Sequence, residues 1–180
     1  MELYSIVLAD GSSLSQIFHV TSMSFALVNI KPLLPGHVLV SPLRNVPRIS
    51  DLTTAEVTDL FLTVNRVGKM VERVFNASSL NIAIQDGIDA GQSVPHVHTH
   101  IIPRKRADLD HRGGSDAIYG MLDGEEGDIA KHLWERMDRR GKFPSVDNDL
   151  REPRTEHEMV EEAEWLAKEM EVEVDDVARE

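Results

Sequence analysis

The sequence predicts an α+β domain: an antiparallel sheet of about five strands packed on one long helix, with a helical extension at the C-terminus. Short apolar runs rich in β-branched residues lie on both sides of one long amphipathic stretch, and turn-forming residues separate them. A second amphipathic stretch lies near the C-terminus. No apolar run approaches the roughly 20 residues needed to cross a bilayer, so no membrane partner is expected.

The expected strands are short and separated by clear turn signals. Ala9-Asp10-Gly11-Ser12 is typical of a hairpin turn. Lys31–Gly36 holds prolines that fix the backbone and a glycine that allows the next bend. The strands predicted from these signals are Leu3–Leu8, Ser15–Val20, Ser24–Ile30, His37–Ser41, Ser79–Gln85 and Pro95–Pro103.

Two helices are predicted, each with a capping box at its start. Thr53 with Glu56 begins the first, and Thr155 with Glu158 begins the second. Residues 171–180 are expected to be frayed. Apolar residues recur at three- and four-residue steps along both helices: Val57, Leu60, Phe61, Val64, Val67, Val71 and Val74 in the first, and Met159, Ala163, Leu166 and Met170 in the second.

The net charge of −12 lies entirely in the C-terminal part, because acidic and basic residues balance up to Lys105. We expect a main domain over residues 1–106, a mobile loop region over 107–154 that carries Tyr119, and an acidic helix and tail over 155–180. An acidic tail repels a phosphate backbone at long range, so nucleic acid is not an expected partner. A small anion in a local pocket remains compatible with this charge.

The chain contains no cysteine, which excludes a disulfide framework and a thiolate zinc site. The N-terminal residues lack the basic and apolar segments of a secretory signal. These features predict a soluble intracellular protein, located in the cytoplasm with the nucleus as a second compartment.

Three histidines alternate with other residues in His96-Val97-His98-Thr99-His100. Successive side chains of a strand point to opposite faces, so the three imidazoles are expected on one face, about 6.6 Å apart along the chain. Val97, Thr99 and Ile101 are then expected on the opposite face, beneath a helix. Such an arrangement suits a zinc site, a nucleophilic imidazole with a neighbouring proton donor, or a pH-sensitive sheet edge.

The run from His96 to Ile102 matches the signature His-x-His-x-His followed by two apolar residues. On this run and the segments below, the chain resembles the fragile-histidine-triad branch of the histidine-triad superfamily. The matching segments are Ser24–Asn29, Lys31-Pro32, Pro35–Val40, Pro42-Leu43-Arg44, Gln85-Asp86-Gly87, Ala90–Val94 and Pro103-Arg104-Lys105.

The resemblance implies a hydrolase of dinucleoside polyphosphates such as diadenosine triphosphate. His98 would attack the α-phosphorus, form a nucleotidyl adduct and expel a nucleoside diphosphate, and water would then release the monophosphate. His100 would help the leaving oxygen depart. His96 and His37 would hold the ring of the nucleophile in its attacking tautomer.

The resemblance also implies the binding residues and the assembly. Asn29 would bind ribose hydroxyls, Gln85 would contact phosphate, and Tyr119 would lie near the second nucleotide. The segment Gly91, Gln92, Ser93 and Val94 would wrap the phosphates, and His100 would touch them as well. No obligatory cofactor or protein-held metal is implied; Mg²⁺ or Mn²⁺ would accompany the polyphosphate. The long helices and sheets of two copies would join across a two-fold axis in a homodimer.

Three other hypotheses remain open at this stage. A histidine-triad phosphoramidase would carry the same triad, although such a chain would stop soon after it. A signalling module would bind the nucleotide and hydrolyse it slowly, with the acidic tail as a partner surface. A zinc-dependent site would use His96, His98 and His37 as ligands.

Overall fold

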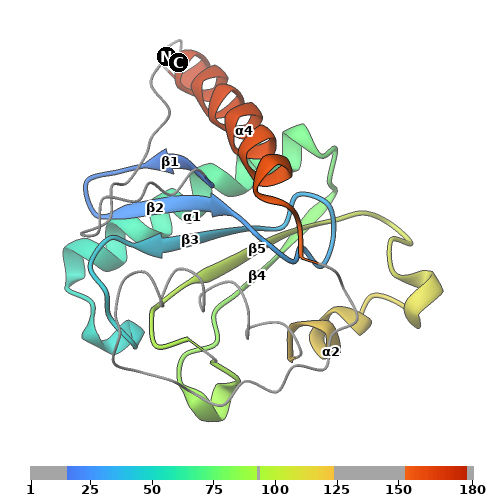
Figure 1. Ribbon diagram of the computed structural model, residues 1–180, viewed down its shortest axis with the longest axis horizontal. Coiled ribbons are helices and arrows are strands. Elements are labelled where there is room, and N and C mark those ends of the chain that lie inside the picture. Colours follow the sequence, from blue (N-terminus) through green and yellow to red (C-terminus); the bar gives the residue numbers. More distant parts are fainter. Residues whose placement is uncertain (1–15, 93, 124–152, 178–180) are drawn as a thin grey trace.

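The computed structural model describes residues 16–92, 94–123 and 153–177. It confirms the α+β prediction, with five antiparallel strands in the order β1-β2-β3-β5-β4 (Figure 1). The strands are β1 (Ile17–Val20), β2 (Ser24–Val28), β3 (Val38–Pro42), β4 (Ser79–Ala83) and β5 (Thr99–Arg104). The helices are α1 (Thr54–Val74), α2 (Ala117–Asp123) and α4 (Glu156–Val177), and the 3-10 turns are η1 (Ile49–Asp51), η2 (Ile88–Ala90) and η3 (Asp110–Arg112).

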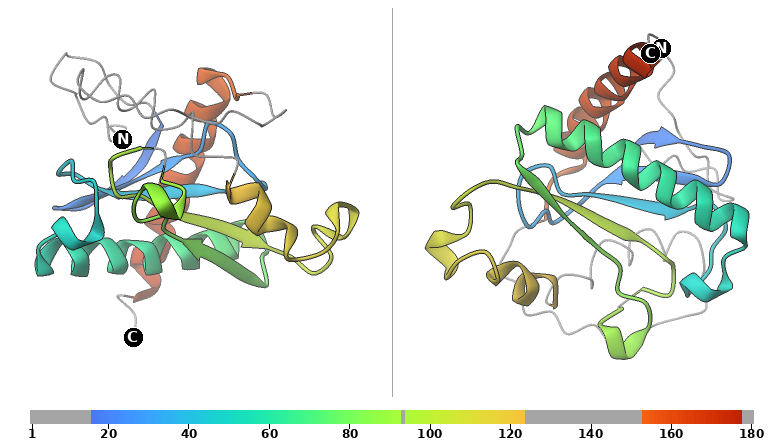
Figure 2. Two further views of the ribbon diagram at one scale, coloured as in Figure 1. Left: turned by 90° about the horizontal axis from the view of Figure 1, so that it is seen from below. Right: turned by 180° about the vertical axis from the view of Figure 1, so that it is seen from behind.

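Two helices cover one face of the sheet and leave the other face for the histidines. Helix α1 crosses behind the sheet, and α4 packs against α1, β1 and β2 (Figure 2). The main core lies between the sheet and these two helices. It includes Val38 and Val40 of β3, Val67 of α1 and Leu166 of α4, which are all buried. Because side chains alternate along a strand, Leu39 of β3 lies on the opposite face.

Both predicted capping boxes are present. The Thr53 N–H donates to Glu56 Oε2 at 2.8 Å, and the Glu56 N–H donates to Thr53 Oγ1 at 3.3 Å. Thr155 and Glu158 make the same pair of bonds at 2.8 and 3.3 Å. The expectation of a frayed end is wrong for residues 171–177, since α4 continues to Val177. That stretch holds no glycine or proline to stop a helix; residues 178–180 lie outside the described part.

The first part of the region expected to be mobile, residues 107–123, packs against the sheet. Leu109, Ile118 and Leu122 are buried and pack with Leu33 and Ile102 in a separate apolar cluster. Arg104 also ties this arm to β5. Its Nε and Nη2 atoms donate to the two carboxylate oxygens of Asp108 at 2.8 and 3.0 Å. The predicted strand Leu3–Leu8 and residues 124–152 lie outside the described residues.

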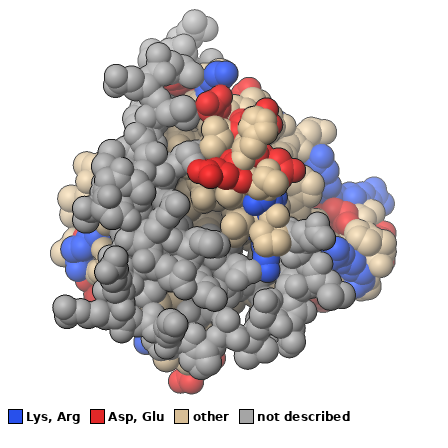
Figure 3. All heavy atoms as spheres, in the orientation of Figure 1, with Lys and Arg blue, Asp and Glu red and all other residues tan. Residues whose placement is uncertain are grey.

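Charges on the described surface are segregated (Figure 3). Acidic side chains gather over the N-terminal half of α4, where Glu156, Glu158 and Glu161 are exposed. Basic side chains gather over the arm between β5 and α2, where Lys105, Arg106 and Arg112 are exposed. A bilayer-spanning helix, by length and hydropathy, does not occur in the ranges that the structure describes.

Candidate active site

The segment that carries the triad is only partly a strand. β5 begins at Thr99, so His96 and His98 precede it, and the predicted strand Pro95–Pro103 is too long at its start. Pro95, at the start of the predicted strand, has no N–H to donate to a neighbouring strand. Here the His96 N–H turns back to the Val94 carbonyl at 2.8 Å. The Val97 N–H then donates to the Val46 carbonyl at 2.8 Å, so this part of the segment pairs with the loop that follows β3.

The predicted alternation nevertheless holds from Val97 onward. Val97 and Ile101 lie in the core beneath α1, and Thr99 is buried. His100 lies in register with Leu39 of β3 and Ala83 of β4, on the face away from α1. The ring centroids of His98 and His100 are 5.1 Å apart, and those of His37 and His100 are also 5.1 Å apart. The sheet thus gathers His37, His98 and His100 on one face.

The tautomer of the neutral His98 ring is fixed by the main chain. His98 Nδ1 lies 2.8 Å from the His96 carbonyl oxygen. A carbonyl can only accept, so Nδ1 carries the proton and the lone pair is on Nε2. With only 9% of its surface exposed, the ring is held in one orientation by its surroundings. This geometry suits a nucleophile whose Nε2 faces the reacting atom.

A second chain of hydrogen bonds fixes the proton on His100. The Leu33 N–H donates to His37 Nδ1 at 3.1 Å, which makes Nδ1 the acceptor and places the proton of the neutral His37 on Nε2. His37 Nε2 lies 2.9 Å from His100 Nδ1 and therefore donates to it. The proton of His100 is then on Nε2. His100 therefore has an N–H donor on Nε2, and its ring lies beside that of His98.

His96 acts on this site through its backbone. Its carbonyl holds His98, while its own ring accepts the Val46 N–H at Nδ1 at 3.3 Å. Burial, followed by the nearby His98 charge, lowers the pKa of His96 from 6.5 to about 4. His96 therefore stays neutral near pH 7.

Asn29 lies beside the ring of His37. Its side chain is buried, its Oδ1 accepts the Lys31 N–H at 2.8 Å, and its Nδ2 lies 3.3 Å from both ring nitrogens of His37. The resemblance implies that Asn29 binds ribose. In the structure both ends of its amide contact protein atoms around His37, which makes it a support for that ring.

The residues expected around the phosphates lie on the η2 loop and near α2. Gln85 Nε2 donates to the Leu122 carbonyl at 3.4 Å, and a Cβ at Gly91 would lie 3.2 Å from the same nitrogen. Gly91 has a φ of +88°, so a side chain there would be strained. Gln85 and Gly91, which are both expected to contact phosphate, therefore lie next to each other.

The side chain of Gln92 has a different task. Its Oε1 accepts the Gly87 N–H at 2.8 Å and its Nε2 donates to the Pro47 carbonyl at 2.9 Å. These bonds close the η2 loop and anchor it to the turn after β3. Val94 is buried, and Ser93 lies outside the described residues.

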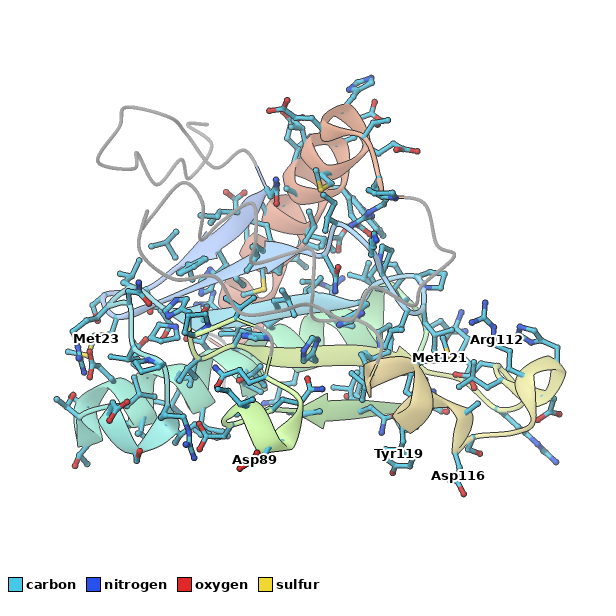
Figure 4. The ribbon with its side chains drawn as sticks, turned by 60° about the horizontal axis from the view of Figure 1, so that its bottom comes forward. Met23, Asp89, Arg112, Asp116, Tyr119 and Met121 are labelled. Carbon is cyan, nitrogen blue, oxygen red and sulfur yellow. The ribbon has the colours of Figure 1, made fainter. Side chains whose placement is uncertain are left out.

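Tyr119 lies on α2 and is largely exposed. It projects from α2 with 60% of its surface exposed, and its side chain points away from the sheet (Figure 4). Asp89 of η2 lies on the same lower side of the molecule in this view.

The zinc hypothesis gains no support from the geometry of the described ranges. They contain no cluster of three or more histidine, aspartate or glutamate side chains placed to hold a metal ion. The nitrogens of His37 already engage Leu33 and His100. His96 directs Nδ1 toward the Val46 N–H.

Sequence reasoning missed two supports of His37. One is the Leu33 N–H, in a turn that the flanking prolines indicate but whose donor they do not reveal. The other is Phe75, whose ring carbons would lie 2.6–2.7 Å from a Cβ at Gly36. The Phe75 ring therefore packs directly on the backbone beside His37. The sequence signal for this close contact is a glycine between two prolines and a histidine.

Replacement of this glycine provides a first prediction. Gly36 has a φ of +83°, and an added Cβ would meet the Phe75 ring at 2.6 Å. We expect Gly36→Ala to destabilise the protein by roughly 2–4 kcal/mol, from backbone strain and overpacking together. Urea denaturation measures this loss. Gly120→Ala is the matched control, since a Cβ there has no neighbour within 4 Å; an equal effect of both changes would refute the packing argument.

Comparison with known proteins places this arrangement in a family. The HIT domain model matches residues 11–107. The chain belongs to the HIT domain family. The matched range contains all five strands, α1 and the gathered histidines, while α4 lies outside it.

Three similar proteins carry informative names. A bis(5'-nucleosyl)-tetraphosphatase (asymmetrical) of Schizosaccharomyces pombe is 50% identical over 84% of this chain and 87% of its own. A bis(5'-adenosyl)-triphosphatase of Dictyostelium discoideum is 54% identical over 62% of this chain and 72% of its own. The crystal structure of the Caenorhabditis elegans NitFhit protein superposes with a TM-score of 0.60 at 37% identity, covering 88% of this chain and 28% of that one.

Proposed function

We propose that this HIT-domain protein hydrolyses dinucleoside polyphosphates, with diadenosine triphosphate cleaved to AMP and ADP. The observation that carries the proposal is the hydrogen bond from His98 Nδ1 to the His96 carbonyl, because it leaves the lone pair of the neutral ring on Nε2. The enzyme names of the two curated relatives support the same class of substrate. Both names describe enzymes that act on a polyphosphate joining two nucleosides, and they differ in the number of phosphates.

The chemistry proceeds in two displacements. His98 Nε2 forms a bond to the α-phosphorus while the bond from that phosphorus to the bridging oxygen breaks, and ADP leaves with the bonding electron pair. Water then attacks the phosphorus of the adduct, releases AMP and returns His98 to its starting form. The His100 N–H stabilises oxygen charge in the first displacement, since its ring centroid is 5.1 Å from that of His98.

Relative turnover of three compounds tests this function. We expect kcat/KM for diadenosine triphosphate to exceed that for adenosine phosphoramidate by at least about tenfold, since one decade needs only about 1.4 kcal/mol of transition-state discrimination. Diadenosine tetraphosphate in the same assay ranks the phosphate number. Faster turnover of the phosphoramidate would overturn the proposal in favour of a phosphoramidase.

We also propose that the protein is a homodimer joined through β4. This strand forms one edge of the sheet, and an edge strand leaves backbone groups open to pairing. Leu80 packs against Gly68 of α1, and Ile82, two residues later on the same face, is 50% exposed. Leu62 of the adjoining α1 is 66% exposed. Pairing of β4 with its copy would cover an apolar edge and extend the sheet.

A charge at this edge tests the dimer. We expect Ile82→Lys to shift the mass in solution from two chains to one, because a buried lysine without a partner is costly. Light scattering after size exclusion gives the mass. Ile88→Lys is the control, since Ile88 is similarly exposed at 65% but lies on η2. A monomeric wild-type protein, or a dimeric Ile82→Lys, would contradict the assignment.

For location we propose the cytoplasm, with the nucleus as a second compartment. The chain has no cysteine, so it needs no oxidising compartment to form disulfide bonds. Cell fractionation with antibody detection tests this, and recovery of the protein in a secreted or luminal fraction would contradict it.

A further inference from the structure

Helix α4 is tied to the residues beneath the triad by one arginine. The Arg154 N–H donates to the Ile30 carbonyl at 2.9 Å, and Nε of its guanidinium donates to the Asn29 carbonyl at 3.1 Å. Its Nη2 donates to the same Asn29 oxygen, and Nη1 forms an ion pair with Glu162. Thus a residue 125 positions away in the sequence clamps the end of β2.

The clamped residue is the one that contacts His37. The Asn29 side chain is buried and places its Nδ2 3.3 Å from both nitrogens of that ring. His37 in turn donates to His100 at 2.9 Å. A connected path therefore runs from the guanidinium through Asn29 and His37 to the donor that flanks the nucleophile.

A second contact from α4 reaches the same histidine independently. Trp165 of α4 packs edge-on against Phe75, with ring centroids 5.4 Å apart. The Phe75 ring lies on the backbone of Gly36, the residue before His37. Arg154, just before α4, and Trp165, within it, thus contact the two neighbours of His37, Asn29 directly and Gly36 through Phe75.

We propose that Arg154 is a positioning residue for the triad: by holding the Asn29 carbonyl it sets the orientation of His37 and hence the proton that His100 carries toward the substrate. The role rests on the hydrolase function proposed above. A guanidinium suits this task because its donors are rigid and planar, so one side chain can hold a carbonyl and a carboxylate together. Glu162 completes the arrangement by orienting the fork.

The test compares two arginines that contact α4 in the same way. Arg154→Met removes the clamp on Asn29 and retains most of the side-chain volume. Arg73→Met is the matched control, because Arg73 also bonds one carboxylate and one carbonyl, both of Glu169 on the same helix, yet lies away from Asn29. Both variants lose a contact between α4 and the body, so both are expected to lower Tm.

Only Arg154→Met should affect the chemistry. We expect its kcat on diadenosine triphosphate to fall about tenfold, since small misplacements of catalytic groups are costly, while KM stays within about twofold. We expect Glu162→Gln to lower kcat by about threefold, because the ion pair with Glu162 contributes only part of what orients the Arg154 guanidinium. Arg154→Lys should recover part of the loss, since it can supply one donor to the Asn29 oxygen.

A readout independent of turnover separates this proposal from the proposed function. Long-range ¹H–¹⁵N spectra of the imidazoles report which nitrogen of His37 and of His100 is protonated, with no substrate present. We expect single tautomers in the wild type and in Arg73→Met, and mixed tautomers of His37 and His100 in Arg154→Met. A wild type that leaves diadenosine triphosphate intact while showing this pattern would refute the function alone.

The proposal is overturned if Arg154→Met lowers Tm but keeps the wild-type kcat and imidazole pattern. If that variant does not fold, Glu162→Gln decides, because it preserves the volume and removes only the charge partner. Wild-type kcat and single tautomers in folded Glu162→Gln would then overturn it.

Discussion

His98→Asn is expected to lower kcat on diadenosine triphosphate by about 10⁵-fold, because loss of a nucleophile removes the covalent route altogether. Asparagine keeps a hydrogen-bonding group of similar reach to Nδ1, so the bond to the His96 carbonyl survives. Binding of the substrate should remain within a few fold of wild type, since the residues expected around the phosphates are unchanged. The measurement is steady-state turnover together with substrate affinity by calorimetry.

The intermediate gives this prediction a second measurement. The P–N bond of a nucleotidyl-histidine is labile in acid and stable in base. Alkaline quench of the wild-type enzyme during turnover should therefore trap the nucleotidyl group, and mass spectrometry of peptides kept at alkaline pH should place it on His98. His157→Asn serves as the histidine control, because that side chain is 81% exposed on α4 and should leave both turnover and adduct unchanged. An adduct on another residue, or His98→Asn retaining a tenth of wild-type kcat, would rule out His98 as the nucleophile.

The parts of the site that could be predicted from sequence depend on local rules. The capping box Thr53–Glu56 and the placement of Val97 and Ile101 beneath α1 follow from periods of 3.6 and 2.0, which need no knowledge of distant residues. The fold class followed from the same periods. The early end of the strand prediction failed at Pro95, because the chain there pairs with a loop near Val46 instead of a strand.

The parts that could not be predicted depend on contacts between distant segments. Whether Gln92 faces a phosphate or closes its own loop is decided by the Gly87 N–H and the Pro47 carbonyl, whose positions no local pattern gives. The polar sequence around Leu109 predicts a mobile arm, and it does not reveal that a few apolar residues spaced along the arm pack on Leu33 and Ile102. Arg154 is 125 positions from its acceptor, and only the folded chain shows that link.

We expect the folded protein to lose stability in mild acid, because His19 and His96 are buried as neutral rings. Burial is the main cause that lowers the pKa of His19 and that of His96, each from 6.5 to about 4. Arg66 lowers the pKa of His19 further, and Asp59 opposes it. Within the described residues, His19 Nε2 has no hydrogen-bond partner that could compensate a charge. Both rings are therefore neutral in the folded protein at pH 7.

The direction of the pH effect on the free energy of unfolding follows from the number of protons that the folded and the unfolded chain bind. Between pH 6.5 and 4 the unfolded histidines take up protons and the folded ones do not, so the free energy of unfolding falls as the pH falls through this window. Each pKa unit corresponds to 1.36 kcal/mol, which gives a loss of roughly 2–3 kcal/mol for each histidine by pH 4. Glu56 and Asp108, whose pKa values are lowered to about 2 mainly by their arginine partners, add their loss only below about pH 4.5.

Urea denaturation at intervals from pH 7.5 to 4.5 separates these contributions. His19→Gln, which removes one titrating ring from the β1–α1 interface, is expected to flatten the decline by about half between pH 6.5 and 4.5. His157→Gln removes an exposed histidine and should leave the slope unchanged. A wild-type stability that stays level down to pH 4.5 would mean that both rings accept protons in the folded state. The neutral His96 on which the site depends would then be wrong as well.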